Sequence, residues 1–262
     1  MLIDSHCHLF YENLKNNLPA VLERANELGV TRFVCVGTNL EDSRASLKLA
    51  EEYEFVYASA GIHPHDAKDV EDGYLQELEE LLSHPKVVAC GEMGLDYFRN
   101  ISDPSVQIKV FQEQMELADG INKPVIFHNR EADTDMVEIL SKYKSVVGVA
   151  HCFSSDLRTA NAFIELGYFI SFSGNLTFKN SVLPGVAKLL PLERLMVETD
   201  SPYLSPAPFR GKPNEPGRTR FVADKLAEIQ GIPIELAPLC VKYRHNGVFG
   251  LLMADVVLFR IH

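Results

Sequence analysis

Two histidines near the start of the chain, His6 and His8, are separated by a single residue. Alternate residues of an extended segment point to the same side, so the two imidazoles could hold one cation together. For this motif alone, two unrelated histidines are an equally good explanation. Asp4 has the same parity one step earlier, and we hypothesise that it orients one of the imidazoles.

A carboxylate and two further histidines, Glu92, His128 and His151, each stand where an apolar run ends. A carboxylate in this position is costly to bury unless a cation or hydrogen-bond donors meet it. Its two oxygens would allow Glu92 to bridge two cations. Taken singly, Glu92 could be a solvated loop glutamate, and each histidine is more often a hydrogen-bonded structural residue than a ligand. Their recurrence at the ends of apolar runs indicates a metal centre.

Asp200 follows another apolar run and could both bind a metal and accept a proton from metal-bound water. Glu198 has the same parity, but it is not assigned as a ligand, because it fits the barrel interior or a supporting place behind the site. Six ligands are too many for one tetrahedral zinc and suit two divalent ions that share a bridge. The predicted ligands are His6, His8, Glu92, His128, His151 and Asp200.

The predicted ligand set contains four imidazoles and two carboxylates. It suits Zn, Mn, Fe or Co better than Mg, which prefers oxygen ligands. Availability in the cell also decides which metal binds, so the identity stays open among Zn, Mn and Mg. We expect Asp200 and Glu92 to be the catalytic residues.

Short apolar runs rich in β-branched residues alternate with segments of helical period, a pattern typical of parallel strands joined by helices. The expected strands are Met1–Ser5, Arg32–Val36, Phe55–Gly61, Val87–Glu92, Pro124–Phe127, Val146–Ala150, Tyr168–Ser171 and Leu195–Glu198. The expected helices are Leu14–Leu28, Leu40–Glu52, Tyr74–Leu82, Ser105–Asp119, Asp133–Tyr143, Asp156–Leu166, Val182–Leu190 and Thr219–Gln230.

Eight such units in 262 residues predict a single (β/α)8 TIM barrel domain over residues 1–262, with an atypical C-terminal tail from about residue 236. The alternative is an open doubly wound sheet, which normally has a Gly-rich loop after its first strand; here Ser5 to His8 occupy that place. In a barrel, the carboxyl ends of the strands form one face, and the predicted ligands would converge there.

The formal net charge of -11 predicts repulsion of nucleic acid and anionic membranes at long range. Local attraction for an anionic substrate must come from bound ions and from basic residues, Arg130 and the group after the eighth strand, which is Arg210, Lys212, Arg218 and Arg220. No membrane association and no obligate protein partner are expected. The five cysteines are scattered singly, which indicates a reducing compartment, the cytoplasm, or the nucleus if the source is eukaryotic.

Several motifs carry a resemblance to the TatD family of metal-dependent deoxyribonucleases, within the amidohydrolase-type barrels. In chain order they are Asp4-Ser5-His6-Cys7-His8, Gly61-Ile62-His63-Pro64-His65, Gly91-Glu92-Met93-Gly94-Leu95-Asp96-Tyr97, His128-Asn129-Arg130, His151-Cys152-Phe153-Ser154 and Glu198-Thr199-Asp200-Ser201-Pro202-Tyr203. The resemblance runs from residue 1 to about residue 232. It implies hydrolysis of DNA phosphodiesters, commonly from the 3′ end, with His63 near the substrate phosphate.

By the same resemblance, His6 and His8 hold one ion with Asp200, and His128 and His151 hold the other. Glu92 then joins the two ions. Some relatives are also linked to the removal of D-amino acids from tRNA.

The chain departs from the family pattern at Ser155, Phe209 and Pro213, and beyond Leu236. The last departure suggests an altered reading frame or splice. Two other functions stay open. One is a hydrolase of carboxyl-ester or C–N bonds, such as an aminoacyl-tRNA deacylase, lactonase or cyclic amidase, although these usually bridge their metals with a lysine carbamate. The other is a non-catalytic metal-binding scaffold.

Overall fold

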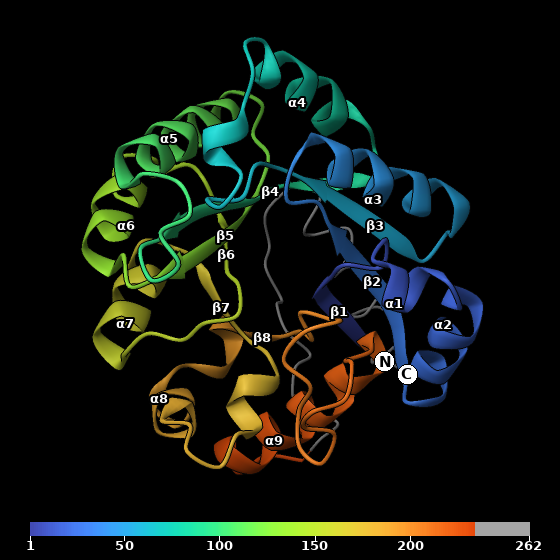
Figure 1. The fold of residues 1–262 in the computed structure, drawn as a ribbon. Helices are drawn as coiled ribbons and strands as arrows, with labels where there is room; N and C mark the ends of the chain where they lie inside the picture. The colour runs from blue at the N-terminus through green and yellow to red at the C-terminus, as the bar shows by residue number, and fades with distance from the viewer. Residues whose placement is uncertain (234–262) are drawn as a thin grey trace, which may run out of the picture.

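The computed structural model describes residues 1–233, so the predicted tail from about residue 236 lies outside the described residues. Eight parallel strands form one sheet in which each strand pairs with the next along the chain. Viewed along the barrel, the strands surround a common axis (Figure 1). The strands are β1 (Leu2–Cys7), β2 (Val30–Val36), β3 (Val56–Ala60), β4 (Val87–Asp96), β5 (Val125–Arg130), β6 (Gly148–Ala150), β7 (Phe169–Phe172) and β8 (Leu195–Val197).

The first and last strands meet at the carboxyl end of the barrel. The backbone N–H of Asp200 donates to the carbonyl of His6 at 2.9 Å, and the N–H of His8 donates to the carbonyl of Ser201 at 2.8 Å. A parallel bridge also joins Cys7 to Ser201. These bonds bring residues far apart in sequence to the same side of the mouth, and the predicted (β/α)8 barrel is confirmed.

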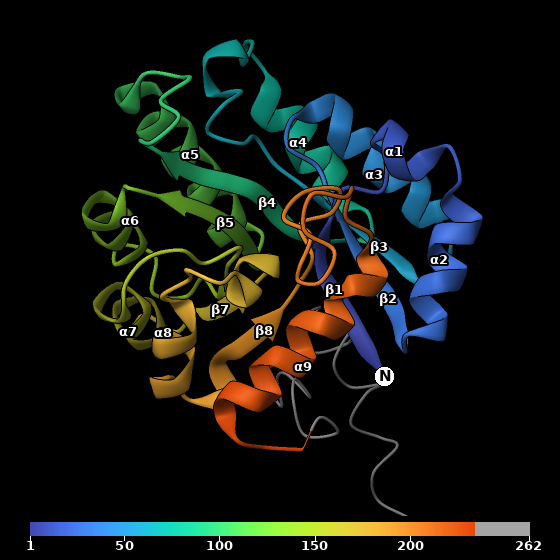
Figure 2. The same cartoon turned by 60° about the horizontal axis from the view of Figure 1, so that its bottom comes forward.

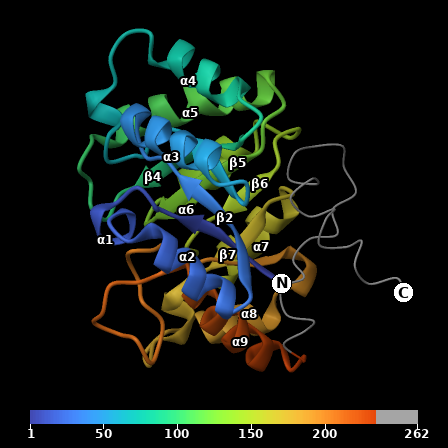
Figure 3. The same cartoon turned by 90° about the vertical axis from the view of Figure 1, so that its right-hand side faces the viewer.

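Helices follow the strands and form a layer outside them (Figure 1). In the tilted view, α9 lies over β8 and beside β1 (Figure 2). The side view shows α1 and the loop that leads from β8 towards α9 at the same end of the barrel (Figure 3). The helices are α1 (Glu12–Lys15), α2 (Leu18–Glu27), α3 (Leu40–Glu52), α4 (Tyr74–Ser83), α5 (Pro104–Gly120), α6 (Asp133–Leu140), α7 (Leu157–Glu165), α8 (Leu183–Leu189) and α9 (Thr219–Gln230).

The first predicted helix, Leu14–Leu28, is divided into α1 and α2. Asn17 lies between them with a φ of -141°, which is outside the helical region. Pro19 occupies the first turn of α2. Proline has no N–H to donate and disfavours a helical conformation in the residue before it, so a helix tends to begin there rather than continue through it. A continuous helical period therefore concealed a break.

Strand β4 continues to Asp96, four residues beyond its predicted end at Glu92. Gly91 and Gly94 have φ values of 141° and 136°, which side chains rarely adopt. A Cβ on Gly94 would collide with the backbone carbonyl of His128 on β5. The absence of a side chain lets the two strands approach closely, which brings the β4 carboxylates towards the β5 imidazole.

The barrel interior is filled by a cluster of buried residues that come only from strands. This cluster is Val34, Val36, Val88, Ala89, Ile126, Val149, Phe169 and Met196. A larger apolar core lies between the sheet and the surrounding helices. The interior is therefore packed, and the polar residues gather above it at the mouth. Within residues 1–233, no helix has both the length and the apolar character needed to cross a bilayer.

Candidate metal centre

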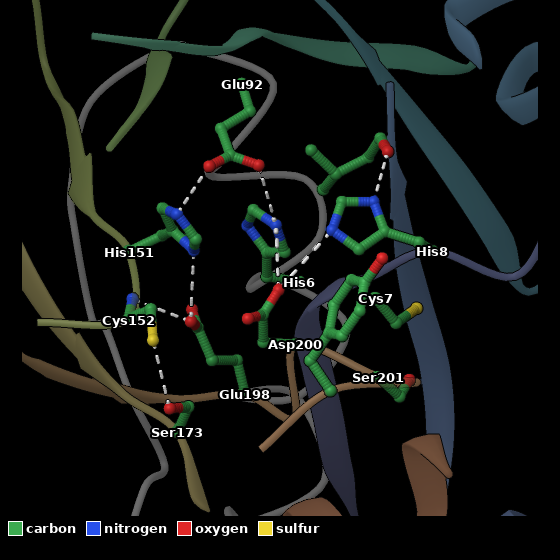
Figure 4. A network of polar contacts seen from close by, with 12 residues as sticks. His6, Cys7, His8, Glu92, His151, Cys152, Ser173, Glu198, Asp200 and Ser201 are labelled. Carbon is green, nitrogen blue, oxygen red and sulfur yellow. Dashed lines mark hydrogen bonds and ion pairs between the residues drawn. The ribbon is translucent and has the colours of Figure 1, made fainter. Parts of the chain in front are cut away.

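The six predicted ligands come from five strands and meet at the carboxyl-end mouth of the barrel. His6 lies in β1 and His8 just after it; Glu92 and His128 lie within β4 and β5; His151 and Asp200 follow β6 and β8. Figure 4 shows His6, His8, Glu92, His151 and Asp200 converging on one space. The ligand assignment of these residues remains a prediction, but their convergence is a feature of the fold.

Glu92 is the centre of the cluster. Its Oε2 lies 3.3 Å from His6 Nε2, whereas its Oε1 lies 2.7 Å from His151 Nε2 and 3.3 Å from His128 Nδ1. The side chain is almost fully buried, with 3% of the residue exposed. The two carboxylate oxygens therefore face different groups of imidazoles, which is the arrangement that a bridging ligand requires.

Asp200 closes the cluster on the β8 side. Its Oδ1 lies 3.4 Å from His8 Nε2 and 3.7 Å from His6 Nε2. His8 is oriented by its other ring nitrogen, because its Nδ1 lies 2.8 Å from the carbonyl of Val36. This contact fits an Nδ1–H donor. The lone pair of Nε2, beside Asp200, is then available to bind a cation.

His63, predicted near the substrate phosphate, lies in the same cluster. Its Nε2 is 3.3 Å from Glu92 Oε1, and its ring centroid is 4.8 Å from that of His128. The donor atoms of His63, Glu92 and His128 lie within 4.8 Å of one another. His151, in turn, shares such a group with His6 and Asp200. His63 therefore lies on the same side of Glu92 as His128 and His151, facing Oε1.

The charges of the cluster depend on each other. Burial alone would raise the pKa of Glu92, but the nearby imidazoles of His151 and His63 lower that pKa well below its usual value. Burial lowers the pKa of His6, and burial also lowers the pKa of His63, to about 4. The pKa of His151 is raised well above its usual value because the carboxylates of Glu92 and Glu198 outweigh burial. The carboxylates are therefore ionised, whereas the imidazoles differ: His6 and His63 are neutral, and His151 must release a proton before it can bind a cation.

One observation tests whether these residues fit divalent ions. His6 is fully buried, yet neither of its ring nitrogens has a hydrogen-bond partner among the described residues. Buried polar groups are normally paired, so an unpaired buried imidazole that faces Glu92 and Asp200 fits a metal ligand. Nitrogen and carboxylate donors also match Zn, Mn, Fe or Co. The residues fit a metal centre.

Two site residues were missed by the sequence analysis. Asp96 is fully buried, and its Oδ2 lies 2.9 Å from His65 Nε2 and 3.1 Å from His128 Nε2. Burial opposes its ionisation, but the contacts with His128 and His65 hold the pKa of Asp96 below its usual value. An ionised Asp96 fixes the outer nitrogen of His128 and leaves Nδ1 facing Glu92. The signal for Asp96 was its shared parity with Glu92; for His65, a second pair of histidines separated by one residue.

Asp96→Asn is expected to weaken metal binding by about 10- to 100-fold, the usual effect of losing a partner that orients a ligand imidazole. Asparagine keeps the size of the side chain but not the charge that fixes His128. Competition against a chelating dye would measure the affinity. Asp72→Asn is the matched control, because Asp72 is exposed in the loop before α4. Unchanged affinity in Asp96→Asn would rule out this orienting role.

Two further carboxylates support the site from behind. Glu198 is fully buried, and its Oε1 accepts the backbone N–H of Cys152 at 2.7 Å and lies 3.3 Å from His151 Nδ1. Asp4 instead accepts bonds from the backbone N–H and hydroxyl of Thr199, at 2.8 and 2.5 Å. The hypothesis that Asp4 orients an imidazole is therefore wrong, because its carboxylate ties β1 to the segment after β8.

The basic residues predicted to attract substrate are partly engaged by the protein itself. The guanidinium of Arg130 lies 3.9 Å from the ring centroid of Phe98, which is 53% exposed. Arg218 lies 4.4 Å over the ring of Phe209, and Arg220 pairs with Asp224 at 2.9 Å. Phe209, one of the departures from the family pattern, thus packs in the loop before α9.

Comparisons with known proteins agree with this architecture. The model of the TatD related DNase family matches residues 3–241. An uncharacterized metal-dependent hydrolase of Bacillus subtilis is 42% identical over 238 residues, covering 90% of this chain and 93% of that protein. A protein of Edwardsiella piscicida named 3′-5′ ssDNA/RNA exonuclease TatD is 37% identical over 235 residues, covering 86% of this chain and 90% of its own length.

Solved structures show the same fold. A TatD homologue of Escherichia coli K12 superposes with a TM-score of 0.85 at 33% identity, covering 89% of this chain and 92% of the other. A TatD family hydrolase of Entamoeba histolytica gives a TM-score of 0.81 at 25% identity, covering 89% of this chain and 92% of the other. The chain belongs to the TatD family of metal-dependent hydrolases.

Proposed function

We propose that this protein is a deoxyribonuclease that uses two divalent ions to hydrolyse phosphodiester bonds. The observation that carries the proposal is the position of Glu92, whose two oxygens face two different groups of imidazoles. A carboxylate placed in this way could be shared by two ions, as in two-metal nucleases. His6, His8 and Asp200 would hold one ion, and His128 and His151 the other, with His63 beside the second.

Bound ions would supply Lewis acidity, which makes water more acidic and stabilises the negative charge that develops on phosphate. The other steps belong to the chain. Burial opposes ionisation of Asp200, but the contact with His8 and the nearby His6 hold its pKa below the usual value. Asp200 is therefore ionised at neutral pH and can orient the attacking water and take its proton.

The substrate assignment rests on similarity and on charge. One relative is named as an exonuclease acting on single-stranded DNA and RNA from the 3′ end. The chain has a net charge of -11, so binding of a polyanion requires local positive charge. The two ions and Arg130 at the rim of the mouth would provide that charge. We therefore propose DNA as the substrate, with cleavage from the 3′ end.

Two further proposals concern the compartment and the domain organisation. The four cysteines within the described residues are free, which favours a reducing compartment such as the cytoplasm. We also propose that the chain acts as a single barrel domain without an obligate protein partner, because the predicted ligands all come from this one chain.

A substrate panel with Mn, Mg and Zn tests the proposed activity. The panel compares single-stranded DNA, duplex DNA, aminoacyl-tRNA and lactones with the metal-replete protein. We expect release of nucleotides from single-stranded DNA. Turnover of aminoacyl esters or lactones alone would favour an esterase of the same fold, and no turnover of any substrate by metal-loaded protein would favour a non-catalytic scaffold.

A further inference from the structure

Tyr203 is an exposed aromatic residue beside the metal centre. The residue is 52% exposed, although three residues earlier the chain places Asp200 in the cluster. The ring centroid lies 6.4 Å from that of His8 and 6.0 Å from that of Tyr11. A tyrosine is large and mostly apolar, so leaving half of it in water forgoes stabilisation that burial would give.

The backbone that carries Tyr203 is held firmly. Its N–H donates to the carbonyl of Asp200 at 2.8 Å. The side-chain amide of Asn214, which is fully buried, donates to the carbonyls of Tyr203 at 2.7 Å and Thr199 at 3.0 Å. The backbone that presents the exposed ring is therefore held in place by these hydrogen bonds.

We propose that Tyr203 stacks on an unpaired nucleobase of the nucleotide at the scissile phosphate. Aromatic side chains bind single strands in this way, because every base has a flat π face. This inference rests on the proposed nuclease function and adds the part of the substrate that the metal ligands do not recognise. Tyr11, which contacts both His8 and Tyr203, supports the ring from the side of the site.

The stacking contact has consequences for specificity. A base inside a duplex is already stacked and paired, and it must leave its neighbours before it can meet Tyr203. Stacking also differs little among the four bases, in contrast to hydrogen-bond recognition. We therefore expect a preference for unpaired 3′ ends and only a weak preference among bases.

A binding experiment separates this role from a purely structural one. The probe is a single-stranded oligonucleotide with 2-aminopurine at its 3′ end and a non-hydrolysable methylenephosphonate at the last linkage. The metal-loaded wild type and Tyr203→Phe are expected to quench the probe. Tyr203→Leu should not quench it and should bind about 5- to 150-fold more weakly, the range that follows from typical stacking contributions. Tyr53→Leu is the control, since Tyr53 is a partly exposed tyrosine at the opposite end of the barrel.

A second probe tests the same contact by removing the base instead of the tyrosine ring. With an abasic 3′ nucleotide, the wild type should bind about 5- to 150-fold more weakly than with the base present, and Tyr203→Leu should then equal the wild type. Equal wild-type affinity for the two probes, or unaltered binding and quenching by Tyr203→Leu, would overturn the role of Tyr203 alone. If the wild type neither binds the probes nor degrades DNA, the nuclease proposal itself fails.

Discussion

Glu92→Gln is expected to reduce turnover by more than about 1000-fold while the barrel stays folded. Loss of a single preorganised electrostatic group already costs about 100- to 1000-fold in other enzymes. We expect a larger loss of turnover for Glu92, because its two oxygens face His6 on one side and His128 and His151 on the other. Glutamine has nearly the same shape, but an NH2 group, which cannot bind a cation, replaces one of these oxygens.

Turnover with saturating metal and single-stranded DNA would be measured beside the circular dichroism of the variant. Glu165→Gln is the matched control, because Glu165 is exposed at the end of α7, away from the mouth. The control should keep wild-type activity. Turnover of Glu92→Gln within about tenfold of the wild type would remove Glu92 from the bridging position.

Metal removal is expected to produce the largest change in stability. A ligand that binds only the folded state at about 1000 times its Kd adds about 4 kcal/mol to the free energy of unfolding. For a domain of this size, each kcal/mol moves Tm by roughly 2–4 °C. Saturation with the physiological metal should therefore raise Tm by roughly 8–16 °C over protein stripped with a chelator.

Calorimetry of stripped and reloaded protein would measure this shift. Asp200→Asn should show a smaller shift, since Asp200 lies near both His6 and His8 and would contribute to one of the two ions. Equal Tm values with and without Mn, Zn or Mg would show that no cation is bound tightly by this cluster.

The convergence of the predicted ligands at one mouth could be predicted from the sequence, because two simple regularities were sufficient. Alternation along a strand places His6 and His8 on the same side, and the parallel barrel brings all strand ends to one face. The positions of the eight strands, and with them the convergence of Glu92, His151 and Asp200, follow from these rules alone. No contact between distant residues had to be known.

Sequence parity could mark the supporting residues as candidates, but it could not give their partners, since these depend on packing between strands. Asp96 joins the site only because β4 continues past Gly94, where the lack of a side chain lets β5 approach. Asp4 has the parity of an orienting residue, but the join between β1 and β8 gives it Thr199 as its partner. The break between α1 and α2 was likewise hidden in a continuous helical period.

The sequence also could not predict which ligands would hold which of the two ions. The family resemblance assigns His128 and His151 to one ion, whereas the geometry groups His151 with His6 and Asp200 and places His63 with Glu92 and His128. A third group joins His6, His8 and Glu92, so His6 and Glu92 each belong to two groups. Only the positions of bound ions distinguish the two assignments.

Anomalous diffraction from crystals loaded with Mn or Zn tests the central claim most directly. We expect two peaks per chain, both inside the cluster of His6, His8, Glu92, His128, His151 and Asp200, with a Glu92 oxygen on each ion. One peak, no peak, or peaks held by other residues would contradict a centre in which this carboxylate bridges two cations.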